Sequence, residues 1–285
     1  MKILRAAHFG MCFGVRDAIR LALHRRTQGP LSVLGDLVHN ETILAQLTTA
    51  GVTILQRPEE AANGTVMISA HGASDRTVQS LRGRGLPVIE ATCPLVHAAH
   101  RAVRQLVAEG FHPVIVGRRD HVEVRGLTGD LDAFDVILDE ADIARLQDRP
   151  RFGVAAQTTQ PIDRVRELVK LLGLQFPRSE IRFIDTVCQP TKQRQSAAME
   201  LAQAVDMVIV VGGAQSNNTR ELVQTCRRFC ERVHHVKNAS ELQPEWLDGA
   251  RSVGITAGTS TPDDIIDGVE KRLQELSVER LSLHD

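Results

Sequence analysis

The stretch HFGMCFGV (residues 8–15) places a cysteine directly after a short apolar segment, and the chain repeats this arrangement twice. The later copies are VIEATCPLV (residues 88–96) and FIDTVCQPT (residues 183–191). The cysteines of the three copies are Cys12, Cys93 and Cys188. A recurring theme of this kind is the sequence signature of equivalent structural units.

Two further themes follow each cysteine in the same order. The first is an apolar run that ends in glycine, and these glycines, 23 or 24 residues after the cysteines, are Gly35, Gly117 and Gly212. The second is an apolar run that ends in alanine before small or hydrogen-bonding residues: VMISAHGAS (residues 66–74), FGVAAQTTQ (152–160) and VGITAGTSTP (253–262). Nine features in register indicate three units of similar construction.

Amphipathic helices are expected between these themes. Pro94 suits a first helical position, apolar residues then recur at i, i+3 and i+4, and Gly110 ends the run. Thr261 is the expected N-cap of a last helix that begins at Pro262. Strands that alternate with helices predict parallel α/β sheets with function at the strand carboxyl ends. We expect three small α/β domains, at residues 1–92, 93–187 and 188–285.

The repeat gives the three cysteines a common purpose. If the units pack around a pseudo-threefold axis with these strand ends inward, Cys12, Cys93 and Cys188 become neighbours. Three thiolates suit an iron-sulfur cluster, and a missing fourth cysteine leaves one iron open. The other two cysteines, Cys226 and Cys230, share an apolar helical stripe with Leu222, Val223, Phe229 and Val233. We interpret that pair as structural.

Composition excludes several classes of function. The chain has 285 residues, a net charge of -1, 3% aromatic residues and no tyrosine, so nucleic acid is not an expected partner. The apolar runs are too short to span a membrane, and residues 1–10 lack the apolar core of a signal peptide. We therefore expect a cytoplasmic protein without a membrane partner.

An ordered set of motifs covers nearly the whole chain: GMCFGV, VHN, SAHG, ATCPLV, HVEVRGLTG, QTT, VCQPTKQRQ, SNNT and TAGTSTP. This set resembles the 4-hydroxy-3-methylbut-2-enyl diphosphate reductase (LytB/IspH) family. The resemblance implies a trefoil-like arrangement of three α/β domains around a central [4Fe-4S] cluster, bound by the three repeated cysteines. It implies that the open iron takes the allylic hydroxyl of the substrate. Reductive removal of water would then give isopentenyl and dimethylallyl diphosphates, with electrons arriving singly from ferredoxin or flavodoxin.

The resemblance also suggests roles for individual residues. It matches the diphosphate-binding positions to His39, His71, His121, Ser216, Asn218 and Ser260, with Asn217 where another serine is usual. Glu123 would relay a proton to the leaving oxygen, Thr158 would bind the substrate hydroxyl, and Gln157 would support them. Histidines and neutral hydrogen-bonding groups suit a diphosphate that must enter and leave, and a desolvated carboxyl group suits proton donation.

Departures from the family pattern leave alternatives open. Glu90 replaces a usual aspartate, Val122 a usual proline and Pro190 a more usual alanine, and Val122 is expected to loosen the loop that aims Glu123. One alternative is a relative that reduces a different allylic diphosphate or alcohol, and another is a non-catalytic iron-sulfur sensor. His97 and His100, on the helix after Cys93, are interpreted as helix surface or packing.

Overall fold

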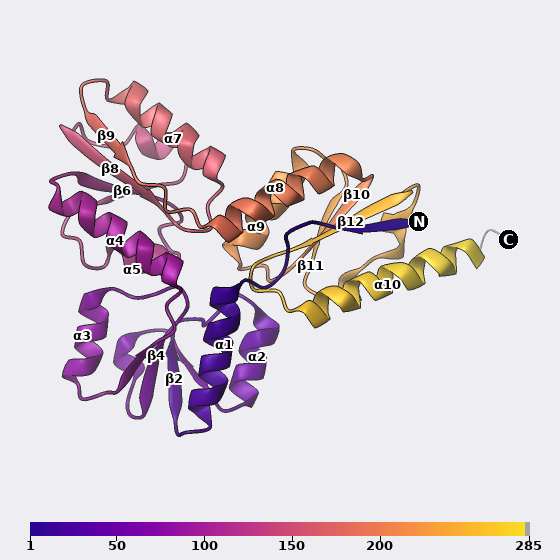
Figure 1. Cartoon of the computed structure of the whole chain (residues 1–285), viewed down its shortest axis with the longest axis horizontal. Helices are drawn as coiled ribbons and strands as arrows, with labels where there is room; N and C mark the ends of the chain where they lie inside the picture. Colours follow the sequence, from indigo (N-terminus) through magenta and orange to yellow (C-terminus); the bar gives the residue numbers. More distant parts are fainter. Residues whose placement is uncertain (283–285) are drawn as a thin grey trace. The chain divides into compact units, whose positions relative to one another are not determined.

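The computed structural model describes residues 1–282, within which the strands form three separate four-stranded parallel sheets (Figure 1). The first sheet, in spatial order, contains β1 (Lys2–Arg5), β12 (Ser252–Ala257), β10 (Met207–Val211) and β11 (Val233–Val236). The second contains β5 (Val88–Glu90), β4 (Thr65–Ile68), β2 (Leu31–Leu34) and β3 (Thr53–Leu55). The third contains β9 (Glu180–Phe183), β8 (Arg151–Ala156), β6 (His112–Val116) and β7 (Asp135–Ile137).

Each sheet repeats one topology, which confirms three α/β units of similar construction. The edge strand that leads into a cysteine is β1, β5 or β9, and its neighbour ends in the alanine theme. One long-range pairing was not expected: β1 pairs in parallel with β12, with Lys2 opposite Ser252. The first strand of the chain therefore completes the last sheet. The predicted domain boundaries at residues 92/93 and 187/188 stay predictions.

The chain divides into two compact units. The first contains Met1–Phe13, His39–Glu41 and the chain from Gln189 onward, and thus the sheet of β1 and β10–β12. The second contains Gly14–Val38 and Thr42–Cys188, and thus the other two sheets. Each unit is described by itself below.

Helices connect the strands, as the alternating pattern predicted. The helices are α1 (Phe13–Arg26), α2 (Glu41–Thr49), α3 (Asp75–Gly83), α4 (Pro94–Ala108), α5 (Val122–Thr128), α6 (Glu140–Ile143), α7 (Ile162–Gln175), α8 (Gln189–Ala204), α9 (Asn217–Arg227) and α10 (Asp263–Ser282). Short 3-10 helices are η1 (Pro58–Glu60), η2 (Ala239–Glu241) and η3 (Pro244–Leu247). Within residues 1–282, no helix is long and apolar enough to cross a membrane.

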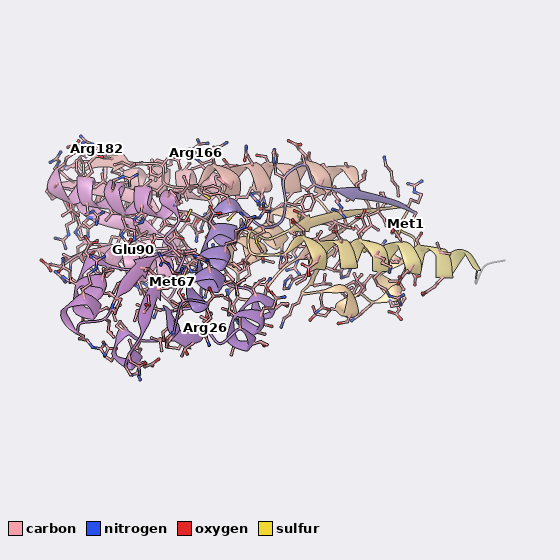
Figure 2. The ribbon with its side chains drawn as sticks, turned by 60° about the horizontal axis from the view of Figure 1, so that its bottom comes forward. Met1, Arg26, Met67, Glu90, Arg166 and Arg182 are labelled. Atoms are coloured by element: carbon pink, nitrogen blue, oxygen red, sulfur yellow. The ribbon has the colours of Figure 1, made fainter. Side chains whose placement is uncertain are left out.

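Packing follows from the apolar face of each helix. In the second unit, α4 places Ala99, Val103 and Leu106 against Ile115 of β6 and Ala155 of β8. The helix that begins directly after Cys93 thus covers the third sheet, whereas the strand before Cys93 belongs to the second sheet. Side chains of sheet interiors are fully buried, as for Met67 of β4, whereas Glu90 at the end of β5 remains exposed (Figure 2).

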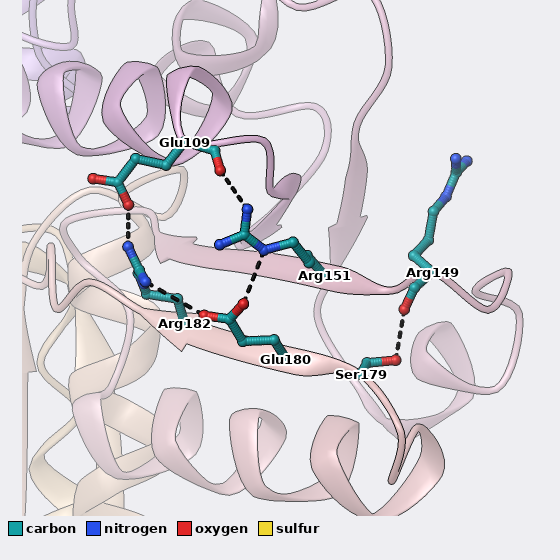
Figure 3. A network of polar contacts seen from close by, with 6 residues as sticks. All are labelled: Glu109, Arg149, Arg151, Ser179, Glu180 and Arg182. Atoms are coloured by element: carbon teal, nitrogen blue, oxygen red, sulfur yellow. Dashed lines mark hydrogen bonds and ion pairs between the residues drawn. The ribbon is translucent and has the colours of Figure 1, made fainter.

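Hydrogen bonds and ion pairs from β8 and β9 connect the third sheet to the end of α4 (Figure 3). Arg151 donates to Glu180 Oε2 at 2.9 Å and to the Glu109 carbonyl at 2.6 Å, and Arg182 pairs with both glutamates. The Arg151 guanidinium also lies 3.9 Å from the centre of the Phe111 ring. These ion pairs are partly exposed, and the expected catalytic end of the sheet is the opposite one.

Two helix boundaries differ from prediction. The last helix begins at Asp263, and its first hydrogen bond runs from Ile266 N to the Pro262 carbonyl at 3.3 Å. The expected N-cap was one residue too early because the Thr261 hydroxyl donates instead to Val211 O. The α9 helix ends at Arg227, so Cys230, which was predicted to share its apolar stripe, lies beyond the helix.

The structural interpretation of the second cysteine pair agrees with its burial. Cys226 and Cys230 are both buried, and burial raises the pKa of the Cys226 thiol to about 12. Phe229, predicted for the same core face, is instead 38% exposed, because the helix has already ended and the chain turns there.

Candidate functional site

The three repeated cysteines occupy equivalent loops. In each case the cysteine amide donates a hydrogen bond to a main-chain carbonyl two residues beyond the end of the adjacent strand. The three bonds, each 3.0 Å long, are Cys12 N to Thr259 O, Cys93 N to Ala70 O and Cys188 N to Thr158 O. This common anchor places each cysteine at the carboxyl edge of its sheet, immediately before a helix.

The thiols of these loops are half-buried, unlike the fully buried Cys226. Within residues 1–282 no cysteine forms a disulfide. In the second unit the Cys93 thiol packs against Gly14, where a Cβ atom would lie only 2.7 Å from Sγ. Only glycine leaves room for the thiol at that position, which the sequence analysis did not identify.

Glu123 is a carboxyl group held inside the second unit. It lies in the first turn of α5, is 1% exposed, and accepts two hydrogen bonds from Thr158. The Thr158 amide donates to Oε1 at 2.6 Å and the Thr158 hydroxyl donates to Oε2 at 3.0 Å. Since the carbonyl of Thr158 accepts from Cys188 N, one residue connects the buried carboxyl group to a cysteine loop.

Burial sets the protonation state of Glu123. Desolvation raises the pKa of its carboxyl group to about 7, although the two hydrogen bonds from Thr158 act in the opposite direction. Burial dominates because the charged form loses its hydration. Glu123 is therefore mostly protonated below about pH 7 and is a candidate proton donor.

Two of the predicted histidines meet in the same unit. His71 follows β4 and His121 caps α5, and their rings lie edge to face with centroids 5.5 Å apart. The Glu123 amide donates to His121 Nδ1 at 3.1 Å, so the neutral ring carries its proton on Nε2. Both imidazoles are thus placed by loops at the carboxyl ends of strands.

Gln157 is fully buried, and its side chain organises two loops. Its Oε1 atom accepts from Arg118 N at 3.2 Å and from Gln160 Nε2 at 3.3 Å, while Nε2 donates to Thr159 Oγ1 at 3.1 Å. These contacts hold the segment that carries Thr158. These contacts connect Gln157 to the Thr158 segment, and its predicted supporting role in the site stays a prediction.

The first unit gathers the polar residues that follow β10 and β12. The Ser216 hydroxyl caps α9 by accepting from Thr219 N at 3.3 Å, and Asn217 and Asn218 form the first turn. Asn218 Oδ1 accepts from Thr259 N at 3.0 Å, whereas Asn218 Nδ2, in a side chain that is 1% exposed, has no hydrogen-bond partner among residues 1–282. This buried amide group is therefore available to a further hydrogen-bond acceptor.

His39 and Ser260 lie together in the first unit. The Ser260 hydroxyl donates to the His39 carbonyl at 3.2 Å. A Cβ atom on Gly213 would lie 2.5 Å from the same carbonyl, so the glycine after β10 permits the contact. The next residue, Asn40, is buried. Gly213 is a second small residue whose part the sequence analysis missed, because its signal is only the doubled glycine at 212–213.

Comparison with known proteins identifies the family of this chain. Residues 3–274 match the family model described as LytB protein. The chain belongs to the LytB protein family. A curated relative, the 4-hydroxy-3-methylbut-2-enyl diphosphate reductase of Aquifex aeolicus, is 40% identical over 280 residues, which cover 96% of each chain.

Solved structures extend the LytB likeness to three dimensions. A structure of (E)-4-hydroxy-3-methyl-but-2-enyl diphosphate reductase, described as the terminal enzyme of the non-mevalonate pathway, matches with a TM-score of 0.68 and 39% identity. The match covers 96% of this chain and all of that one. The Plasmodium falciparum reductase matches with a TM-score of 0.88 at 24% identity, over 95% of this chain and 87% of that one, and shows the common fold.

The donor set of this LytB chain fits the iron-sulfur cluster that the family implies. Three half-buried thiols stand on equivalent loops, and the space at Gly14 accommodates the Cys93 sulfur without a competing side chain. Thiolates are the protein ligands that such clusters require. Cys226 and Cys230 are buried in the apolar interior, which suits packing and not ligation.

The departures from the LytB pattern are accommodated in the local structure. Val122 is the first residue of α5, a position that suits proline but does not require it, and the His121 cap keeps Glu123 on Thr158. Pro190 is the second residue of α8, where a missing amide donor is tolerated. Glu90 lies 3.5 Å from His97 and 3.8 Å from Arg82.

The two histidines that the sequence analysis placed outside the site, His97 and His100, lie at the helix surface and in its packing, respectively. His97 is partly exposed beside Glu90, whereas His100 is buried and faces Gly72, whose φ is 77°. Burial lowers the pKa of the His100 imidazole to about 4, so the ring is neutral. Neither joins the predicted binding residues.

Proposed function

We propose that this chain is a 4-hydroxy-3-methylbut-2-enyl diphosphate reductase, which forms isopentenyl and dimethylallyl diphosphates in the last step of the non-mevalonate pathway. The observation that carries the proposal is the Glu123–Thr158–Cys188 connection. A buried carboxyl group with its pKa near 7 receives two hydrogen bonds from a residue whose carbonyl anchors a cysteine loop. A proton donor connected through one residue to the loop of a proposed cluster ligand suits reductive removal of a hydroxyl group.

The reaction balance assigns a task to Glu123. Removing the allylic hydroxyl as water consumes two electrons and two protons, one proton on the leaving oxygen and one on the allylic carbon. Glu123 supplies the proton to the leaving oxygen, because its burial keeps the carboxyl group protonated until about pH 7. Thr158 orients Glu123 by donating to it, and the Thr158 hydroxyl oxygen can still accept a hydrogen bond from the substrate hydroxyl group.

Cys12, Cys93 and Cys188 would hold the [4Fe-4S] cluster. When bound, the cluster would supply single electrons and a Lewis-acidic iron. We propose ferredoxin or flavodoxin as the electron donor and the cytoplasm as the location. These are one-electron carriers, which match the two single-electron deliveries that the balance needs.

The diphosphate would be bound by neutral donors and histidines. Asn218 Nδ2 is a buried donor awaiting an acceptor, at the first turn of α9 where main-chain amides favour anions. Ser216 and Asn217 follow β10 and Ser260 follows β12, and His39, His71 and His121 add imidazole N–H groups that can donate to phosphate oxygen.

The proposal is tested by anaerobic oxidation of reduced methyl viologen by cluster-loaded protein, with and without 4-hydroxy-3-methylbut-2-enyl diphosphate. We expect oxidation that depends on the substrate. Its rate should be at least about a hundredfold lower in Glu123→Gln. Glu180→Gln is the matched control, because Glu180 is a partly exposed ion-pair carboxylate remote from the strand carboxyl ends (Figure 3).

Two other results would point away from the reductase. Protein with intact iron and sulfide that turns over only another allylic diphosphate or alcohol would favour a different substrate. Protein with an intact cluster that catalyses reduction of none of them would favour a sensor. Normal turnover by Glu123→Gln would refute the assigned proton donor.

A further inference from the structure

Arg194 is a buried cation in the second turn of α8 that the activity described above does not use. It is 8% exposed and lies six residues after Cys188. An arginine is charged at every accessible pH, and burying a charge is costly unless the protein satisfies it. A buried arginine on α8, whose other buried residues are all uncharged, therefore needs a specific partner.

That partner is the loop before Cys12. Arg194 Nε and Nη2 both donate to the Gly10 carbonyl, at 3.1 and 2.8 Å, and Nη1 donates to the Pro190 carbonyl at 3.0 Å. The fork thus joins the helix after the third cysteine to the segment two residues before the first. Both ends of the contact lie in the first compact unit.

The Cys12 loop shares the cysteine-amide anchor with both of its counterparts and has this clamp in addition. Gly10 N donates to Ala257 O at 3.1 Å and Cys12 N donates to Thr259 O at 3.0 Å. Gly10 has a φ of 71°, and a Cβ atom there would lie 3.0 Å from Ile266 Cδ1. The positive φ at this turn favours glycine, whose backbone is the least restricted of all residues. A contact on the Gly10 carbonyl therefore restricts the backbone of the loop at this position.

We propose that Arg194 is a positioning residue for Cys12: its guanidinium clamps the Gly10 carbonyl and so holds the Cys12 thiol in the orientation that binds an iron-sulfur cluster. The inference rests on the proposed function, since only a chain that ligates a cluster through Cys12 needs its thiol held in this way. Lysine keeps the charge but offers no planar fork, so Arg194→Lys retains part of the effect and Arg194→Met none.

The test compares cluster-loaded wild type, Arg194→Met and Arg194→Lys. Hydrogen exchange of a peptide that spans residues 8–14 reports loop order, and the rate of iron loss to a chelator reports cluster retention. Arg232→Met is the matched control, because Arg232 lies in the same unit and also binds a main-chain carbonyl, that of Trp246.

We expect roughly tenfold faster exchange and iron loss in Arg194→Met, an intermediate effect in Arg194→Lys, and wild-type behaviour of both readouts in Arg232→Met. A folded Arg194→Met with wild-type exchange and iron loss would overturn the inference. If Arg194→Met does not fold, wild-type iron loss in Arg194→Lys overturns it instead.

The proposed function fails separately. Wild-type protein that binds no iron would refute both the proposed function and this inference. Wild-type protein that keeps its cluster, beside an Arg194→Met variant that is indistinguishable from it, refutes the inference alone.

Discussion

The unfolding free energy of Glu123→Gln, compared with that of the wild type, is expected to increase as the pH rises. The carboxyl pKa is raised from 4.5 to about 7 by burial, and a difference of this size corresponds to about 3 kcal/mol. Because the folded-state pKa is the higher one, the stability linked to the proton is fully present below pH 4.5. It is lost as the pH rises to about 7.

Glutamine does not titrate, so Glu123→Gln escapes this loss. The variant loses an acceptor for Thr158, but that cost is the same at every pH and cancels when two pH values are compared. Between pH 4.5 and pH 8 the unfolding free energy of the variant should therefore gain about 3 kcal/mol on that of the wild type.

The assay is denaturant unfolding of both proteins at the two pH values, followed by circular dichroism. Glu180→Gln serves as the control, since it makes the same substitution at a partly exposed carboxylate in the same unit. A stability gap between Glu123→Gln and wild type that is the same at both pH values would refute the reasoning that burial keeps Glu123 protonated.

Three further predictions follow from single contacts. Thr158→Val removes the hydroxyl bond to Glu123 Oε2, so the carboxyl pKa rises and the upper limb of the pH profile of turnover moves to higher pH; an unmoved limb would contradict this. Asn218→Asp keeps the acceptor for Thr259 N but turns a carboxylate oxygen toward the anion, so KM for the diphosphate should rise at least about a hundredfold, and an unchanged KM would argue against the assigned pocket. Gly14→Ala places a methyl group 2.7 Å from Cys93 Sγ, so iron content per chain should fall while Gly268→Ala, at an open helical position, retains iron; equal iron contents would exclude crowding at Gly14.

The sequence predicted the repeated construction because the same cysteine, glycine and alanine themes recur in order, and each theme marks a strand end. The pairing of β1 with β12 could not be predicted from pattern, since residues 2–5 carry no sign of which distant edge they join. The end of α9 at Arg227 was missed because residues 226–233 keep a helical apolar spacing past the point where the chain turns.

Some site residues were predicted from the sequence, whereas their contacts and several other residues were not. Glu123 and Thr158 came from a resemblance, whereas their direct contact and the bond from Cys188 to the Thr158 carbonyl depend on how two loops meet. Gly14, Gly213 and Arg194 have no chemical signature along the chain. Their roles depend on close contacts between segments that are distant in the sequence, which only the folded structure reveals.

The most direct test of the account is the pH dependence of product formation from 4-hydroxy-3-methylbut-2-enyl diphosphate by cluster-loaded protein under anaerobic conditions. The account predicts that isopentenyl and dimethylallyl diphosphates form, at a rate that falls as the pH rises through about 7, where Glu123 loses its proton. Absence of both products from protein with an intact cluster, or a Glu123→Gln variant that forms them at the wild-type rate, would contradict it.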